Sequence, residues 1–161
     1  MNIKNGKLYI YDVDLEYRDY LRKYDNKVSM KEGRRFYGIV ITKDNIDYCI
    51  PFTSKVKKRN SKLTINIKNK NKLIAQLLIN NMIPVKDSVI KKVDVNNDKY
   101  KEYLQDEIFY LKSKNIIYEI LKKVERSFTI LDDKNHVDYS FYKNICCEYR
   151  LLEEKCRKYK K

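Results

Sequence analysis

The chain has 161 residues, the length of one domain, and 43% of them are hydrophobic, which is enough to form a core without disulfides or metal. The low counts of three Gly and two Pro exclude collagen-like sequences and glycine-rich linkers. With 36 Lys and Arg against 22 Asp and Glu, the net charge is +14, which favours polyanionic partners. We therefore expect a single domain over residues 1–161.

The N-terminal half predicts strands around one helix. Residues 8–11 form a short β-prone run, and Asp12 or Asp14 is a candidate N-cap for a helix that continues to about residue 24. A polar, basic loop is expected over residues 26–35. Residues 36–41 and 46–52 flank a turn at residues 43–45, which predicts an antiparallel hairpin. Because Pro51 cannot donate a hydrogen bond, we expect the second strand to end, or to reach a sheet edge, there.

The C-terminal half changes from strand to helix. Residues 63–67 alternate like a half-buried strand, residues 73–85 fit either helix or strand, and residues 82–85 favour a strand. From about residue 98 to residue 124 apolar positions recur at helical spacing, as one helix or two, and a final helix is expected over residues 139–158. This order predicts an α+β domain, a mostly antiparallel sheet with helices added to it.

The positive charge is concentrated in one segment. A chain rich in Lys, Asn, Ile and Tyr is typical of an A+T-rich genome, but that bias would spread the excess evenly. Instead, residues 27–72 contain 13 basic and 3 acidic side chains. This density favours nucleic acid as the partner. An anionic membrane surface, an acidic protein and a merely solvated face are the alternatives.

Few residues suggest metal or cofactor chemistry. No C-x-x-C spacing joins the four cysteines, which we expect to be buried and reduced: Cys49, Cys146, Cys147 and Cys156. His136 is the only histidine, and we expect an ordinary loop residue. Phosphate-binding glycine motifs are absent from the sequence, as are a signal peptide and an apolar run of membrane-spanning length. We therefore expect a cytoplasmic protein with no metal, no cofactor and no membrane.

Two hydroxyls followed by cations are the best candidates for chemistry. Thr53 and Ser54 come directly after a predicted strand. Cations near a phosphodiester stabilise its developing charge, hydroxyls hold it in line, and RNA supplies its own 2′-OH nucleophile. A loop that only grips phosphates is equally compatible with these residues. Further basic residues expected to contact RNA are Lys31, Arg35, Lys58, Arg59 and Lys62, with Tyr37 and Tyr48 as candidates for base stacking.

A family resemblance rests on these residues. Residues 34–41 (Arg-Arg-Phe-Tyr-Gly-Ile-Val-Ile), then Tyr48, then Pro51-Phe52-Thr53-Ser54 with trailing lysines resemble the toxins of type III toxin–antitoxin systems. These are the ToxN/AbiQ endoribonucleases, to which CptN proteins also belong. Residues 20–25, 82–85 and 151–155 agree in the same order, so the resemblance covers nearly the whole chain.

The resemblance implies a compact, strongly twisted antiparallel sheet with a barrel-like core similar to the Kid/MazF toxins. It also implies metal-independent RNA cleavage that leaves a 2′,3′-cyclic phosphate and a 5′-OH. The implied partners are cellular mRNA and a repetitive antitoxin RNA, which the toxin cuts into inhibitory pseudoknots that join toxins into closed rings. The implied role is phage defence by abortive infection.

The family's catalytic positions fall on named residues here. Its Thr-Ser pair falls on Thr53 and Ser54, its upstream basic residue on Arg34, and its downstream lysine on Lys55 or Lys57. A tyrosine that some relatives carry before the upstream basic residue has no counterpart in this shorter loop. We expect Ser54 to position the 2′-OH and the phosphate while a lysine exchanges protons. The alternative function is a non-catalytic, basic RNA-binding protein.

Overall fold

The computed structural model describes residues 1–29, 36–59 and 61–161. Its strands are β1 (Asn2–Ile3), β2 (Ile10–Val13), β3 (Tyr37–Lys43), β4 (Ile46–Thr53), β5 (Thr64–Asn69), β6 (Lys72–Leu78), β7 (Ile83–Val85) and β8 (Ile90–Lys92). Its α-helices are α1 (Leu15–Arg22), α2 (Lys101–Leu111), α3 (Lys114–Asp132), α4 (Tyr139–Ile145) and α5 (Tyr149–Lys158). The expected α+β class is confirmed.

The strands form one antiparallel sheet. Its order is β5-β6-β4-β3-β2-β8, with β1 paired to β3 and β7 paired to β4. Within the described residues the sheet is open, because β5 and β8 lie at its two ends and are not joined. The expected barrel-like closure is therefore absent from this part of the chain, and the likeness to the Kid/MazF toxins stays a prediction.

The central hairpin is confirmed. Asp44 and Asn45 both have positive φ, 51° and 62°, as a two-residue turn that matches the strand twist requires. The paired register runs from Lys43 opposite Ile46 to residue 38 opposite residue 51.

Of the two alternatives expected at Pro51, the end of the strand is wrong, and a local gap in the pairing on one side of β4 is observed. The strand continues to Thr53 because it gains a new partner, β6. Phe52 pairs with Leu77, and Thr53 pairs with Gln76. Pro51 lies between these pairs and the last β4–β7 pair, which is at residue 49. The change of partner places Thr53 beside β6, and Ser54 follows directly after the strand.

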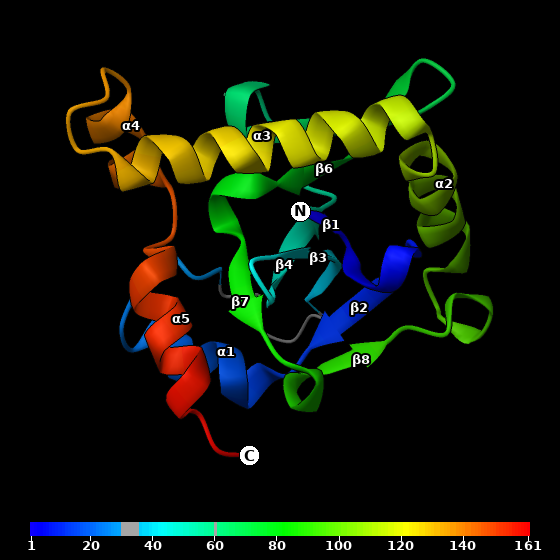
Figure 1. Cartoon of the computed structure of the whole chain (residues 1–161). Coiled ribbons are helices and arrows are strands. Elements are labelled where there is room, and N and C mark those ends of the chain that lie inside the picture. The colour runs from blue at the N-terminus through cyan, green and yellow to red at the C-terminus, as the bar shows by residue number, and fades with distance from the viewer. Residues whose placement is uncertain (30–35, 60) are drawn as a thin grey trace.

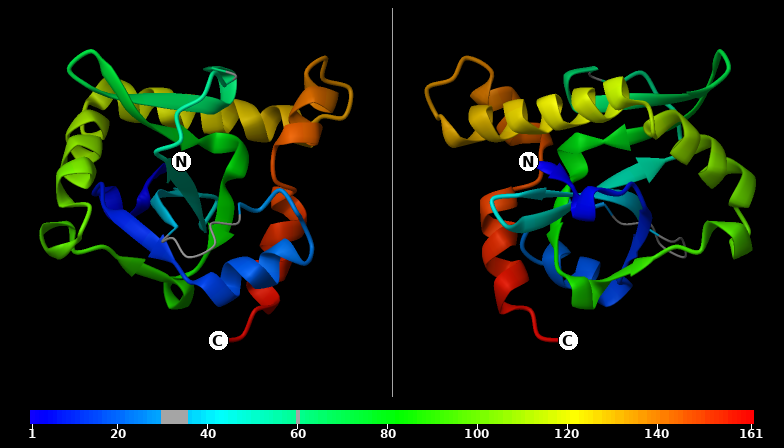
Figure 2. Two further views of the ribbon diagram at one scale, coloured as in Figure 1. Left: turned by 180° about the vertical axis from the view of Figure 1, so that it is seen from behind. Right: turned by 45° about the vertical axis from the view of Figure 1, so that its right-hand side comes forward.

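Helices cover the sheet on two sides. Asp14 caps α1 as predicted, since its Oδ1 accepts from the Glu16 N–H at 2.9 Å. Figures 1 and 2 show α3 crossing one side of the sheet and α1 lying beside α5 on another. One core cluster joins the sheet to α2 and α3 through residues such as Leu104 and Phe128, and a second joins it to α1 and α5 through residues such as Leu21 and Leu152.

Two element boundaries differ from the predictions. The first predicted strand, residues 8–11, is shifted to residues 10–13. The helical stretch after residue 98, expected as one helix or two, forms the two helices α2 and α3. The final helix is also divided. Cys147 donates its backbone N–H to the Asn80 carbonyl at 2.9 Å, and Glu148 donates its own to Asp25 Oδ2 at 2.7 Å. These long-range bonds replace the helical ones and separate α4 from α5.

The two tyrosines proposed for base stacking belong to the core, which contradicts that expectation. Tyr48 is 2% exposed and donates its hydroxyl to Glu153, whereas Tyr37 is 8% exposed and donates to Asp98. Burial and the neighbouring Glu153 carboxylate raise the pKa of Tyr48 well above its usual value. Alternating strand residues face opposite sides, and both rings face the larger core cluster.

Gly38 is the position where the hairpin tolerates no side chain. A Cβ there would lie 2.4 Å from the Ile50 carbonyl oxygen and 2.6 Å from Cys49 Sγ. We expect Gly38→Ala to reduce the free energy of unfolding by about 3 kcal/mol, as overpacking does. Gly6→Ala is the matched control. Its Cβ meets nothing within 4 Å, so only the positive φ of 65° opposes it, at about 1 kcal/mol. Urea denaturation measures both, and equal losses would contradict the steric argument.

Removing the Tyr48 hydroxyl tests its role in the core. Tyr48→Phe leaves the buried Glu153 carboxylate without one donor, so we expect a loss of about 1 to 2 kcal/mol in the free energy of unfolding. RNA affinity should stay unchanged, because the ring is not accessible. Tyr118→Phe, at a side chain that is 68% exposed, is the control and should change neither quantity. A loss of RNA affinity without a loss of stability would restore the stacking hypothesis.

Candidate active site

The Thr53–Ser54 pair lies where β4 leaves the sheet. Thr53 is 8% exposed, and its Oγ1 accepts a hydrogen bond from the Lys55 backbone N–H at 3.2 Å. Ser54 is exposed, and its carbonyl accepts from the Val56 N–H at 3.0 Å. Its hydroxyl has no hydrogen-bond partner among the described residues. Thr53 therefore shapes the turn, and the Ser54 hydroxyl is available to a ligand.

Three exposed lysines follow the hydroxyls. Lys55, Lys57 and Lys58 are exposed, and no acidic side chain within the described part of the chain forms an ion pair with them. Lys62 differs, since its Nζ lies 3.4 Å from Asp138 Oδ2. The first three lysines can bind phosphates without first giving up an acidic partner in the described part of the chain.

Arg59 donates hydrogen bonds within its own segment, residues 55–59, and to the neighbouring strand β6. Its Nη2 donates to the Lys55 carbonyl at 3.3 Å, and its Nε donates to the side chain of Gln76. This internal role could not be predicted from the sequence, because residue type and spacing do not distinguish an arginine that binds its own backbone from one that binds RNA. The expectation that Arg59 contacts RNA stays a prediction.

The start of β3 lies beside the end of β4. The predicted site residues Lys31, Arg34 and Arg35 lie outside the described residues. Phe36, the next described residue, donates its backbone N–H to Asp12 Oδ1 at 3.0 Å. The hairpin register continues from residue 38 opposite residue 51, so Phe36 lies at the same end as Thr53, as predicted.

Arg18 of α1 is a cation that the sequence analysis missed. It is 4% exposed, and its guanidinium lies 4.9 Å from the centroid of the Phe36 ring. Its Nε and Nη1 have no hydrogen-bond partner among the described residues. Burial lowers the pKa of the Arg18 guanidinium, and the nearby Asp12 carboxylate opposes this shift. A buried cation thus adds positive potential next to Phe36, the residue that precedes β3.

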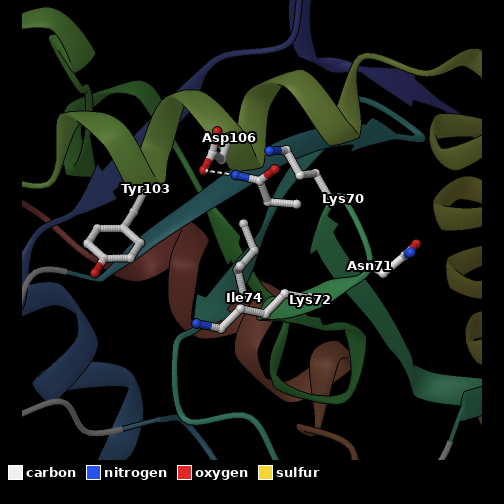
Figure 3. Close-up of a pocket in the computed structure, with 7 residues that line it drawn as sticks. Lys70, Asn71, Lys72, Ile74, Tyr103 and Asp106 are labelled. Carbon is white, nitrogen blue, oxygen red and sulfur yellow. Dashed lines mark hydrogen bonds between the residues drawn. The ribbon is translucent and has the colours of Figure 1, made fainter.

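A separate open pocket lies between the β5–β6 turn and α2 (Figure 3). Its volume is about 620 Å³, and Asn69 donates to Asp106 across it at 2.5 Å. Tyr103 and Ile74 are among its lining residues, and in Figure 3 the Asn71 side chain points away from the Asn69–Asp106 hydrogen bond. None of the predicted site residues that the structure describes lines this pocket, so we treat it as separate from the Thr53–Ser54 pair.

The remaining candidates have structural roles or none. All four cysteines are buried and free, as predicted, and burial raises the pKa of the Cys146 thiol to about 12. His136 lies in a turn, where its Nδ1 accepts from the Asp138 N–H at 3.0 Å. The described residues contain no cluster of three or more metal-binding side chains. Among the described helices, none is both long enough and apolar enough to span a membrane.

Known proteins match this chain over most of its length. The family model described as "Toxin ToxN, type III toxin-antitoxin system" matches residues 9–157. Endoribonuclease ToxN of Bacillus thuringiensis subsp. kurstaki is 31% identical, over 92% of this chain and 82% of that protein. Endoribonuclease AbiQ of Lactococcus lactis subsp. lactis is 30% identical, over 96% of this chain and 90% of that protein.

Solved structures agree with these sequence matches. A structure described in terms of selective toxin inhibition by a non-coding RNA pseudoknot has a TM-score of 0.86 and 28% identity, and covers 95% of this chain and 98% of that one. The structure of AbiQ, described as a lactococcal anti-phage endoribonuclease, has a TM-score of 0.80 and 29% identity, over 96% and 98%. The family resemblance found in the sequence is confirmed: this chain belongs to the ToxN family of type III toxin–antitoxin toxins.

Proposed function

We propose that this chain is a metal-independent endoribonuclease toxin whose active site is the Thr53–Ser54 pair with the cations around it. The observation that carries the proposal is the exposed Ser54 hydroxyl, which lies beside the anchored Thr53 and before three lysines without acidic partners in the described chain. The family membership and the endoribonuclease names of two relatives support the same reaction class.

The proposed reaction is an internal transesterification of RNA. The 2′-O attacks the adjacent phosphorus and loses its proton, the bond to the 5′-O breaks, and that oxygen gains a proton. The products are a 2′,3′-cyclic phosphate and a 5′-OH. Ser54 positions the 2′-OH and the phosphate, Lys55 or Lys57 stabilises the developing charge, and a lysine of this segment exchanges protons. Arg34, which lies outside the described residues, is proposed as a further phosphate contact.

The proposed partners follow the relatives. A neighbouring toxin is described as inhibited by a non-coding RNA pseudoknot, so we propose an antitoxin RNA of this kind for this chain. Processing of a repetitive precursor, assembly into closed toxin–RNA rings and attack on cellular mRNA complete the proposal. AbiQ is described as anti-phage, which supports phage defence as the role here. Lys58 and Lys62 are proposed contacts to the RNA backbone.

Purified protein incubated with RNA and EDTA tests the reaction. We expect cleavage with 2′,3′-cyclic phosphate and 5′-OH ends. Ser54→Ala should abolish it while antitoxin-RNA binding stays within several-fold, because the substitution removes a positioning hydroxyl and no charge. Ser140→Ala, at an exposed serine of α4, is the matched control and should cut at the wild-type rate.

Each other outcome has a definite meaning. Equal rates for Ser54→Ala and the wild type would remove Ser54 from the mechanism. Products with 3′-OH ends would contradict 2′-OH attack. Binding of RNA with no cleavage by the wild type would favour the alternative function, a non-catalytic RNA-binding protein.

The exposed lysines make RNA affinity depend on salt. Neutralising one phosphate of single-stranded RNA releases about 0.7 counterion, so Lys58→Gln should reduce the slope of log K against log salt by about 0.7. Lys158→Gln is the control, because Lys158 Nζ already lies 2.6 Å from Glu154 Oε1 on α5. Titration of a fluorescent RNA at several salt concentrations measures both slopes. An identical slope for Lys58→Gln and the wild type would exclude this contact.

A further inference from the structure

Gln76 of β6 lies directly beside the candidate active site. It pairs with Thr53 in the β4–β6 register and is 1% exposed, because the segment 55–59 covers it. Its side-chain Oε1 accepts from the Lys57 backbone N–H at 3.1 Å and from Arg59 Nε at 2.9 Å. Its Nε2 donates to the Lys57 carbonyl at 2.9 Å and to Asn66 Oδ1 at 2.9 Å.

This arrangement uses the full capacity of the amide group. A glutamine side chain has two donors and two acceptor positions, and all four have a partner here. Arg59 can only donate, so it fixes which end of the amide is the oxygen. Neighbouring β6 residues Ala75 and Leu77 are buried and apolar. A buried amide is costly unless it is hydrogen-bonded, so the covering segment and the glutamine stabilise each other.

Gln76 binds both the N–H and the carbonyl of the Lys57 backbone. This single side chain binds them as a neighbouring strand would do, although residues 55–59 have no regular secondary structure. The lysine side chains of this segment stay exposed while its backbone is fixed. Fixing a cation before the substrate arrives lowers the entropic cost of placing it at the transition state.

We propose that Gln76 is a positioning residue for RNA cleavage, which holds Lys55 and Lys57 in register with the Thr53–Ser54 hydroxyls. The inference rests on the proposed function, because it assumes that these groups act on the scissile phosphate. Gln76 itself touches no substrate. Its effect passes through the backbone of Lys57 and the guanidinium of Arg59.

Gln76→Met tests this role, because methionine has a similar size and no hydrogen-bonding amide. We expect kcat to fall by about 10- to 100-fold, the scale of a misplacement of about 1 Å. KM and the antitoxin-RNA Kd should stay within about 3-fold, because no charge changes. Asn66→Ala is the matched control. It removes the one bond on the β5 side, leaves the three bonds to the covering segment, and should keep kcat within about 3-fold of the wild type.

A second substitution and a second measurement complete the test. Gln76→Glu keeps both acceptors and loses both donors, so its kcat should lie between those of Gln76→Met and the wild type. If circular dichroism shows that Gln76→Met does not fold, the kcat of Gln76→Glu is used to test the proposal instead. Amide hydrogen exchange followed by NMR should show the Lys57 N–H protected in the wild type and in Gln76→Glu, which keeps its acceptor, and unprotected in Gln76→Met.

The outcomes separate this inference from the proposed function. If the wild-type protein does not cleave RNA, the proposed function fails, whatever Gln76 does. If the wild type cleaves and the folded Gln76 variants keep its kcat, the inference is overturned. A rise in KM alone, or equal losses for Asn66→Ala and Gln76→Met, would also overturn it, because binding or sheet stability would then be the cause.

Discussion

The exchange of partners along β4 is the constraint on which the site depends. Its first part pairs with β3 and β7, and its last two residues pair with β6. One strand thus belongs to both halves of the sheet, and its end is held by its pairing with β6. Thr53 is held by this pairing, and Ser54 is the first residue beyond it. The position of Thr53 therefore follows from strand pairing, and the exposed segment after it is held by Gln76, by Arg59 and by the Thr53 hydroxyl.

Charge and burial divide the basic residues into separate roles. The excess of positive charge in residues 27–72 is a property of the sequence, but its members differ in the structure. Lys58 is exposed without an acidic partner in the described chain, Lys62 is paired with Asp138, and Arg59 braces the backbone. Arg18 lies outside the charged segment and still places a buried cation against Phe36. The local charge thus marks the segment that we propose to bind RNA, without identifying which of its side chains are available.

Local patterns predicted the elements whose hydrogen bonds are local. The hairpin turn at Asp44 and Asn45 and the Asp14 cap follow from residues adjacent in sequence, and both are confirmed. The prediction of one continuous final helix was wrong, because the break between α4 and α5 depends on acceptors far away in the chain, the Asn80 carbonyl and Asp25. The same limit applies at Pro51, where the continuation of β4 required knowledge of β6.

The sequence by itself determined the α+β class, the hairpin, the concentration of charge and the motif that carries the family resemblance. These features depend on residue type and on spacing along the chain. Only the tertiary structure decided that Tyr37 and Tyr48 are core residues, and that Gln76 lies under the lysine segment. A tyrosine can stack on a base or pack in a core, and an amide can face water or brace a loop. The choice depends on which face of the strand is covered, and residues distant in the sequence provide that cover.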